Sequence, residues 1–279
     1  MGKSNLCLVI LTISALAANV SYAAGKKQSS QIHIAKDQHG QVVVSWNGKG
    51  VLKQADASGR FRPVHTRGDS YVVQPTEGQA IYQLEGPIVS VNVVGYVNLS
   101  LPPGDSLIAN PLYYTNNTVA FWWPDAPDGA QVLKYLPEIQ GYAVSTFDAL
   151  AGAWSDPEFE IGLGQGFFFR NTSTETITQT FVGEVLQGRL VNHLPAGPSM
   201  KGSLVPQEGS INTLHQIPGL DGDIIKFWVN NGEGGGDYIL STFISSENAW
   251  VPDLNLGVGQ GFWIEKQEAQ DWVRFFSVN

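Results

Sequence analysis

The stretch YAVSTFDALAGAWSDPEFEIGLGQGFFF, residues 142–169, has a close counterpart in YILSTFISSENAWVPDLNLGVGQGFWI, residues 238–264. Both contain Ser-Thr-Phe after an aromatic residue, a tryptophan seven residues beyond the phenylalanine, and a Gly-x-Gly-Gln-Gly-Phe run. Agreement in order and spacing indicates an internal duplication that determines the architecture. Matched residues of the two copies are expected to have structural roles: Trp154, Trp250, Gly164, Gly166, Gly259 and Gly261.

The duplication extends on the N-terminal side of this stretch. Residues 101–104, LPPG, correspond to residues 194–197, LPAG, and both copies end in a strand-like run. We therefore predict two homologous β-repeats, at 89–186 and 187–279. They form either two separate units or two halves of one pseudo-symmetric body.

Residues 25–88 show a different pattern, in which runs such as QVVVSW and AIYQL alternate with turn residues. This rhythm favours a small antiparallel sandwich. The whole chain contains 31 Gly, 15 Pro, 8 Trp, 9 Tyr and 13 Phe but only 15% charged residues, which favours short strands over long helices. The expected fold class is therefore all-β, with a small N-terminal β-module before the two repeats.

Residues 1–24 have the charged, apolar and small-residue regions of a secretory signal peptide. Cys7, the only cysteine, lies inside this segment, so the mature chain would be cysteine-free. No second apolar run of spanning length follows, and we expect no stable membrane insertion. The mature protein is predicted to be exported, either to the periplasm or outside the cell.

The formal net charge of −9 argues against nucleic acid or an anionic membrane surface as a partner. No pattern in the sequence indicates a cofactor. The calcium hypothesis depends on Glu158 and Asp253, acids that occupy matched positions in the two copies. Ordinary turn chemistry is the alternative for these acidic stretches.

The order LPxGxS, DG, YxxSTF, Trp and GxGQGF(F/W) resembles a group of uncharacterised exported bacterial proteins that carry this repeat in tandem. Members often have a small N-terminal β-module, fibronectin-like in style, and residues 30–86 are similar to such a module. The resemblance implies architecture and export, and it implies no particular reaction.

Trp122 and Trp123 are the candidate binding residues. An alignment without gaps pairs them with His215 and Gln216, so these positions are expected to tolerate solvent. If exposed, the two indoles would form a patch for stacking on a sugar or docking a protein. Burial at a domain interface is the alternative.

Three functions follow as hypotheses. The first is a non-enzymatic binding or structural protein whose partner is an envelope glycan or another surface protein, with self-association as an option. The second is a glycan-binding module that uses Trp122 and Trp123. The third is a hydrolase with carboxylates between the repeats, for which Asp148, Glu158 and Glu160 are the nearest group. We expect no enzyme, because the chain lacks the GxSxG and HExxH motifs and a cysteine nucleophile in its mature part.

Overall fold

The computed structural model describes residues 30–56, 59–75, 78–86, 92–231 and 235–278. The predicted signal peptide lies outside these residues. The described chain is built of antiparallel sheets with one four-residue helix, which confirms the all-β fold class. None of its helical segments has the length and apolar character needed to cross a lipid bilayer.

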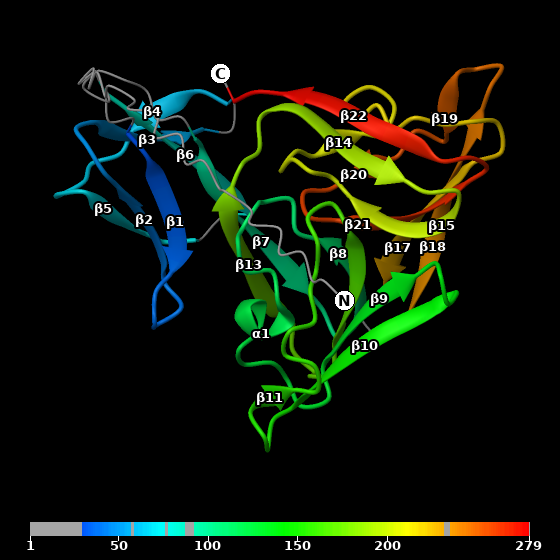
Figure 1. Ribbon diagram of the computed structural model, residues 1–279, viewed down its shortest axis with the longest axis horizontal. Coiled ribbons are helices and arrows are strands. Elements are labelled where there is room, and N and C mark those ends of the chain that lie inside the picture. The colour runs from blue at the N-terminus through cyan, green and yellow to red at the C-terminus, as the bar shows by residue number, and fades with distance from the viewer. Residues whose placement is uncertain (1–29, 57–58, 76–77, 87–91, 232–234, 279) are drawn as a thin grey trace, which may run out of the picture.

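The N-terminal module is a sandwich of two antiparallel sheets (Figure 1). One sheet, ordered β1-β2-β5, consists of β1 (Ile32–Lys36), β2 (Val42–Trp46) and β5 (Ser70–Val73). The other, ordered β13-β7-β6-β3-β4, consists of β3 (Val51–Ala55), β4 (Phe61–Pro63), β6 (Gln79–Glu85), β7 (Val94–Leu101) and β13 (Ile177–Glu184). Because β7 and β13 come from the first repeat, this sheet runs across the predicted boundary at residue 88.

Each repeat contributes one five-stranded sheet. In the first repeat the elements are β8 (Gly104–Ala109), α1 (Val119–Trp122), β9 (Gln131–Leu136), β10 (Gly141–Asp148), β11 (Ala153–Trp154) and β12 (Gly166–Asn171). In the second they are β14 (Gly188–Leu194), β15 (Gly197–Gly202), β16 (Gly209–Ser210), β17 (Ile224–Asn230), β18 (Gly236–Ile244), β19 (Ala249–Val251), β20 (Asn255–Leu256), β21 (Gly261–Lys266) and β22 (Gln270–Phe276).

The two repeats have the same topology. The order β11-β10-β9-β12-β8 in the first corresponds to β19-β18-β17-β21-β15 in the second, and the pair β7–β13 corresponds to β14–β22. Registers agree as well, since Leu101 pairs with Ile177 and Leu194 pairs with Gln270. The sequence duplication is therefore a duplication of fold.

The Ser-Thr-Phe step makes the same hydrogen bond in both copies. Ser145 Oγ donates to Asp156 O at 3.0 Å, and Ser241 Oγ donates to Pro252 O at 2.7 Å. Both serines are fully buried, where an unpaired hydroxyl would be costly. A serine at this position thus ties the long strand of each sheet to the loop after the tryptophan.

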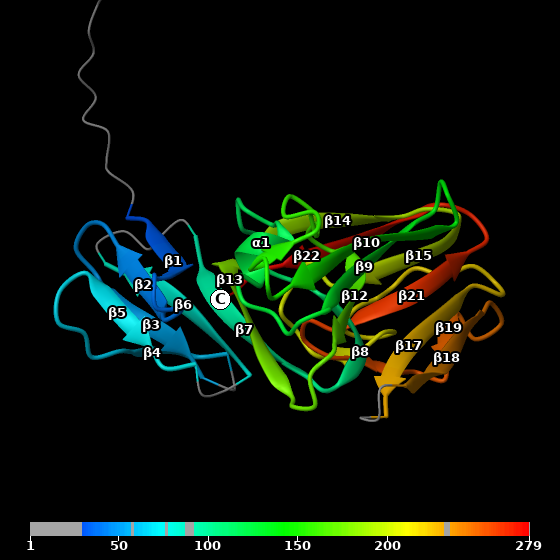
Figure 2. The same ribbon diagram turned by 90° about the horizontal axis from the view of Figure 1, so that it is seen from below.

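The repeats meet at a seam with approximate two-fold symmetry. Ile108 of β8 forms a bridge to Gln260, and the matched Lys201 of β15 forms a bridge to Gln165. Each repeat therefore pairs its β8 or β15 strand with the Gly-Gln-Gly turn of the other, and the two sheets lie side by side (Figure 2).

The cores of the two repeats are separate. One cluster of buried side chains runs from the N-terminal module through the first repeat, and a second lies within the second repeat. A third, small cluster at the seam contains Leu107, Phe168 and Met200. The second repeat is thus a unit with its own core, attached to the rest through the seam.

Candidate functional site

The matched tryptophans are structural in both repeats. Trp154 and Trp250 are buried, and each indole closes a loop by donating to a main-chain carbonyl. Trp154 Nε1 donates to Trp123 O at 2.7 Å, and Trp250 Nε1 donates to Ile217 O at 2.8 Å. The predicted packing role is confirmed.

Gly164 and Gly259 provide turns that other residues adopt rarely, since both have φ of +70°. Their carbonyls cross the seam. Gly164 O accepts from Gly202 N at 3.0 Å, and Gly259 O accepts from Ala109 N at 2.9 Å. The glycine turn that characterises the repeat therefore joins one copy to the other.

Gly166 and Gly261 permit close approach of the two repeats. A Cβ at Gly166 would lie 2.8 Å from Lys201 O, and one at Gly261 would lie 2.8 Å from Ile108 O. Both glycines open strands and not helices, as the sequence indicated. These runs serve the seam, and no helix N-terminus follows them to bind phosphate.

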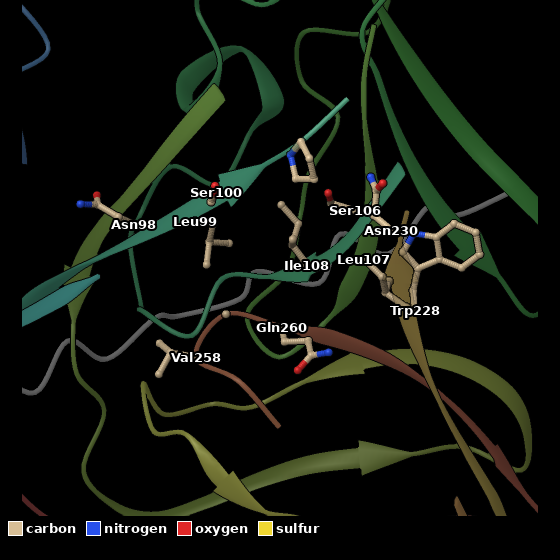
Figure 3. A pocket seen from close by; sticks show the side chains of 12 residues that line it. Asn98, Leu99, Ser100, Ser106, Leu107, Ile108, Trp228, Asn230, Val258 and Gln260 are labelled. Carbon is tan, nitrogen blue, oxygen red and sulfur yellow. The ribbon is translucent and has the colours of Figure 1, made fainter. Parts of the chain in front are cut away.

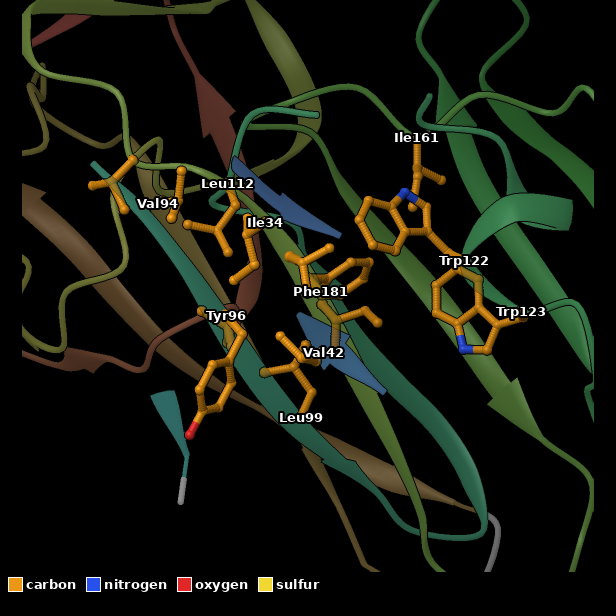
Figure 4. Close-up of a cluster of buried hydrophobic side chains, with 14 of the residues drawn as sticks. Ile34, Val42, Val94, Tyr96, Leu99, Leu112, Trp122, Trp123, Ile161 and Phe181 are labelled. Atoms are coloured by element: carbon orange, nitrogen blue, oxygen red, sulfur yellow. The ribbon is translucent and has the colours of Figure 1, made fainter. Parts of the chain in front are cut away.

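Trp122 and Trp123 are buried, with 1% and 3% of their surface exposed, so the prediction that these positions can face solvent is wrong. Trp122 packs edge-on against Phe181 at 4.9 Å between ring centroids (Figure 4). Trp123 stacks on Phe169 at 4.9 Å between ring centroids. Lys36 of the N-terminal module lies 6.0 Å from the Trp122 ring. The two indoles therefore fill the core shared with that module and offer no stacking surface.

The error comes from the alignment without gaps. Trp122 N donates to Thr118 O, and the same bond in the second repeat runs from Leu214 N to Ser210 O, so Leu214 is the true counterpart of Trp122. The second repeat then has two extra residues, the first of which, His215, is itself fully buried. A polar residue at this position therefore did not indicate exposure to solvent.

Glu158 and Asp253 have different environments despite their matched positions. Glu158 is exposed, whereas Asp253 Oδ2 accepts from Ser210 Oγ at 2.6 Å and Oδ1 accepts from Asn212 N at 3.3 Å. Across the described ranges, no three His, Cys, Asp or Glu side chains gather closely enough to hold a metal ion. Asp253 orders a turn, and calcium binding stays a prediction without a site in the described part of the chain.

A buried ion pair distinguishes the second repeat from the first. Lys266 Nζ donates to Asp223 Oδ2, both side chains are fully buried, and Leu220 N donates to the same carboxylate at 2.7 Å. The matched residues of the first repeat are Ala130 and Asn171. Because its groups are mutually bonded inside the core, this pair is structural.

Aromatic side chains line the seam in two matched triplets, one around Trp228 and one around Tyr135. Across the seam, Trp228 lies 5.6 Å from Phe168 and Tyr135 lies 4.7 Å from Trp263, measured between ring centroids. Each triplet is completed by a half-exposed tyrosine, and the members are Phe168, Trp228 and Tyr238 on one side and Trp263, Tyr135 and Tyr142 on the other.

The two outer phenols stay protonated at neutral pH. Burial, followed by the neighbouring groups of Tyr238, Tyr135 and Asp105, raises the pKa of Tyr142 to about 12. Burial also raises the pKa of Tyr238. These rings can donate hydrogen bonds but do not supply a base.

A pocket of about 290 Å³ opens at the seam beside Trp228 (Figure 3). Trp228 and Asn230 lie at one end, Leu99 and Val258 at the other, and Gln260 between them. The remaining lining residues are Asn98, Ser100, Pro102, Ser106, Leu107, Ile108 and Gly259. No charged side chain lines the pocket, so it lacks the carboxylate pair of a glycosidase.

The second repeat provides the end of the pocket that contains Trp228 and Asn230, and hydrogen bonds to the first repeat hold this end in place. Trp228 Nε1 donates to Asp105 O at 2.6 Å, while Asn230 Nδ2 donates to Pro103 O and Asp105 O at 2.9 Å each. Arg170 holds the side chain of Asp105 through two bonds, at 2.7 and 2.9 Å. The indole of Trp228 is therefore held in one orientation.

Two strands leave part of an edge open. β19 pairs with residues 242–244 of β18, and β11 pairs with residues 147–148 of β10. The earlier parts of β18 and β10 pair with β17 and β9 on their inner side and have no strand on their outer side in the described chain. Exposed apolar side chains occupy these parts, namely Tyr142, Val144, Tyr238, Ile239 and Leu240.

Comparisons with protein-family models, with curated proteins and with solved structures give no match to this chain. The resemblance to exported bacterial repeat proteins thus stays a prediction.

The sequence analysis did not single out Trp228, although KFWVN aligns with LKYLP and so aligns Trp228 with Tyr135. A position that is aromatic in both copies, tyrosine in the first and tryptophan in the second, was the signal that could have indicated this residue.

Proposed function

We propose that this is an exported, non-enzymatic structural or interaction protein that associates with further copies of itself through the open edges of its repeats. The observation that carries the proposal is the open part of β18. Tyr238, Ile239 and Leu240 are 39%, 49% and 50% exposed there, and the matched Tyr142 and Val144 of β10 are both 42% exposed.

An open edge is a template for pairing with another strand. Proteins that must stay monomeric usually protect such edges with lysine, proline or a bulge. Between Gly236 and Ser241 the only charged residue is Asp237. The edge thus lacks the usual protection and presents apolar side chains instead.

The sequence of this edge is compatible with antiparallel pairing to itself. A two-fold axis at Ile239 would place Tyr238 opposite Leu240 and Asp237 opposite Ser241. Aromatic and aliphatic residues are favourable cross-strand partners, and no like charges face each other. A second copy of the chain therefore fits the edge chemically.

Other functions receive less support from the described residues. The glycan hypothesis at Trp122 and Trp123 requires exposed rings, which both residues lack. A hydrolase requires two carboxylates in one cleft, and the seam pocket contains none. The net charge of −9 remains unfavourable for nucleic acid.

Sedimentation velocity over a wide range of protein concentration tests the proposal on the mature chain. We expect association that strengthens with concentration and is abolished by Ile239→Lys. Leu150→Lys is the control, because Leu150 is an aliphatic residue that is 99% exposed but lies in the turn between β10 and β11 and belongs to no strand. A monomer at every concentration, or equal association of the two variants, would refute self-association through this edge.

A further inference from the structure

The seam pocket has the features of a small-ligand site. Its volume of about 290 Å³ is close to the lower limit of the range for ligand pockets, roughly 300–1,000 Å³. Trp228 provides an aromatic group whose position is fixed by the bond to Asp105 O. Leu99, Ile108 and Val258 add aliphatic surface.

Polar groups accompany this apolar surface. Ser106, which carries a hydroxyl group, is among the lining residues. Gln260 Oε1 accepts from Gly257 N at 2.9 Å, which fixes the amide, and within the described part of the chain its Nε2 has no hydrogen-bond partner. An aromatic group beside hydroxyl and amide groups suits a ligand with one apolar face and several hydroxyls.

The absence of charge in the lining limits the ligand further. Neither a cation nor an anion bound here would be compensated, and an uncompensated charge is costly to desolvate. Asp105, whose main-chain carbonyl accepts from the Trp228 indole, has its carboxylate already paired with Arg170. The lining therefore favours a neutral ligand.

The symmetry-related positions carry different residues. Leu99, Ile108, Trp228 and Asn230 correspond to Asn192, Lys201, Tyr135 and Pro137. Burial lowers the pKa of Lys201, whose ammonium stands where the pocket has the apolar Ile108. The backbone of the seam is duplicated, but this set of lining residues occurs on one side only.

We propose that the seam pocket binds a single neutral pyranose unit of a glycan, packed against Trp228 and hydrogen-bonded by Gln260 and Ser106. The site adjoins the open part of β18, because Trp228 packs against Tyr238 at 5.0 Å between ring centroids, whereas Gln260 precedes β21 and Ser106 lies in β8. It also differs from the glycan site expected at Trp122 and Trp123, which the core fills.

Binding of neutral oligosaccharides to the mature protein tests the proposal, first on a glycan array and then by calorimetry with the best neutral ligand and an oligogalacturonate as the acidic comparison. Gln260→Glu keeps the acceptor for Gly257 N and removes the amide donor, so affinity should fall roughly tenfold. Gln165→Glu is the matched control, since Gln165 Oε1 accepts from Gly162 N on the other side of the seam.

Trp228→Ala should abolish binding, and circular dichroism will show whether the variant is folded. Gln260→Glu keeps the test valid if it is not. The proposal is overturned if no neutral glycan binds, if the acidic oligosaccharide binds better than the neutral ones, or if Gln260→Glu and Gln165→Glu bind equally well. Sedimentation of Gln260→Glu should match the unmodified protein, which separates this result from failure of the self-association proposal.

Discussion

Gly261→Ala should destabilise the protein, because the added methyl group has no room at the seam. Its Cβ would lie 2.8 Å from Ile108 O and 3.0 Å from Ile108 C, which are main-chain atoms that cannot rotate away. Overpacking of this kind costs about 1–3 kcal/mol. Gly166→Ala should behave alike, since its Cβ would lie 2.8 Å from Lys201 O.

The first glycine of each motif is the control. A Cβ at Gly257 would approach the flexible side chain of Gln260 at 3.3 Å, and one at Gly162 would approach that of Gln165 at 3.4 Å. Alanine at these positions should change the free energy of unfolding by less than about 1 kcal/mol in either direction. The mild contact in the folded state is offset because alanine lowers the conformational entropy of the unfolded chain.

Urea unfolding of the four single variants measures these differences directly. We expect lower midpoints for Gly166→Ala and Gly261→Ala than for the two controls, with similar slopes. If all four variants unfold at the same urea concentration, close approach at the seam is not the reason both copies keep these glycines, and the two-fold arrangement inferred from them fails.

Three further results are expected. Asp223→Ala should cost about 3–5 kcal/mol in urea unfolding by leaving Lys266 buried and unpaired, and adding Lys266→Asn, as in the first repeat, should recover part of it. Burial lowers the pKa of His215 from 6.5 to about 4. The unfolded chain therefore takes up the proton first, and the free energy of unfolding should fall by about 3 kcal/mol as the pH drops from 6.5 to about 4. His215→Gln should remove this dependence when unfolding is measured at several pH values. Trp250→Phe should destabilise more than Trp122→Phe, by about 1 kcal/mol in thermal unfolding, because the Trp250 indole has a carbonyl partner and the Trp122 N–H has none in the described residues.

The duplication and the all-β class could be predicted because a repeated fold needs the same turns at the same spacing. Gly164 requires a positive φ, and Trp154 closes a loop within its own repeat, so both residues recur at the same spacing in each copy. Where the copies differ in length the prediction failed. Two extra residues near His215 shifted the alignment, so the positions of Trp122 and Trp123 were expected to tolerate solvent, with burial at a domain interface as the alternative.

The contact between copies could not be predicted at all, since an alignment compares residues that are equivalent and not residues that touch. Gln165 aligns with Gln260, yet it contacts Lys201, which aligns with Ile108. The pocket depends on this crossed arrangement, because Trp228 of one repeat is held by the main chain of the other at Asp105. Only the relative placement of the repeats brings these groups together.

This crossed arrangement also explains how a duplicated fold can acquire a function on one side. The Gly-Gln-Gly turns bond main chain to main chain, so they hold the seam whatever side chains surround them. Side chains beside the turns can then diverge, as Ile108 and Lys201 have, without loss of the interface. Exchanging the two, Ile108→Lys with Lys201→Ile, should therefore leave the seam assembled while moving the apolar lining from one side to the other, and sugar binding at Trp228 should be lost with it.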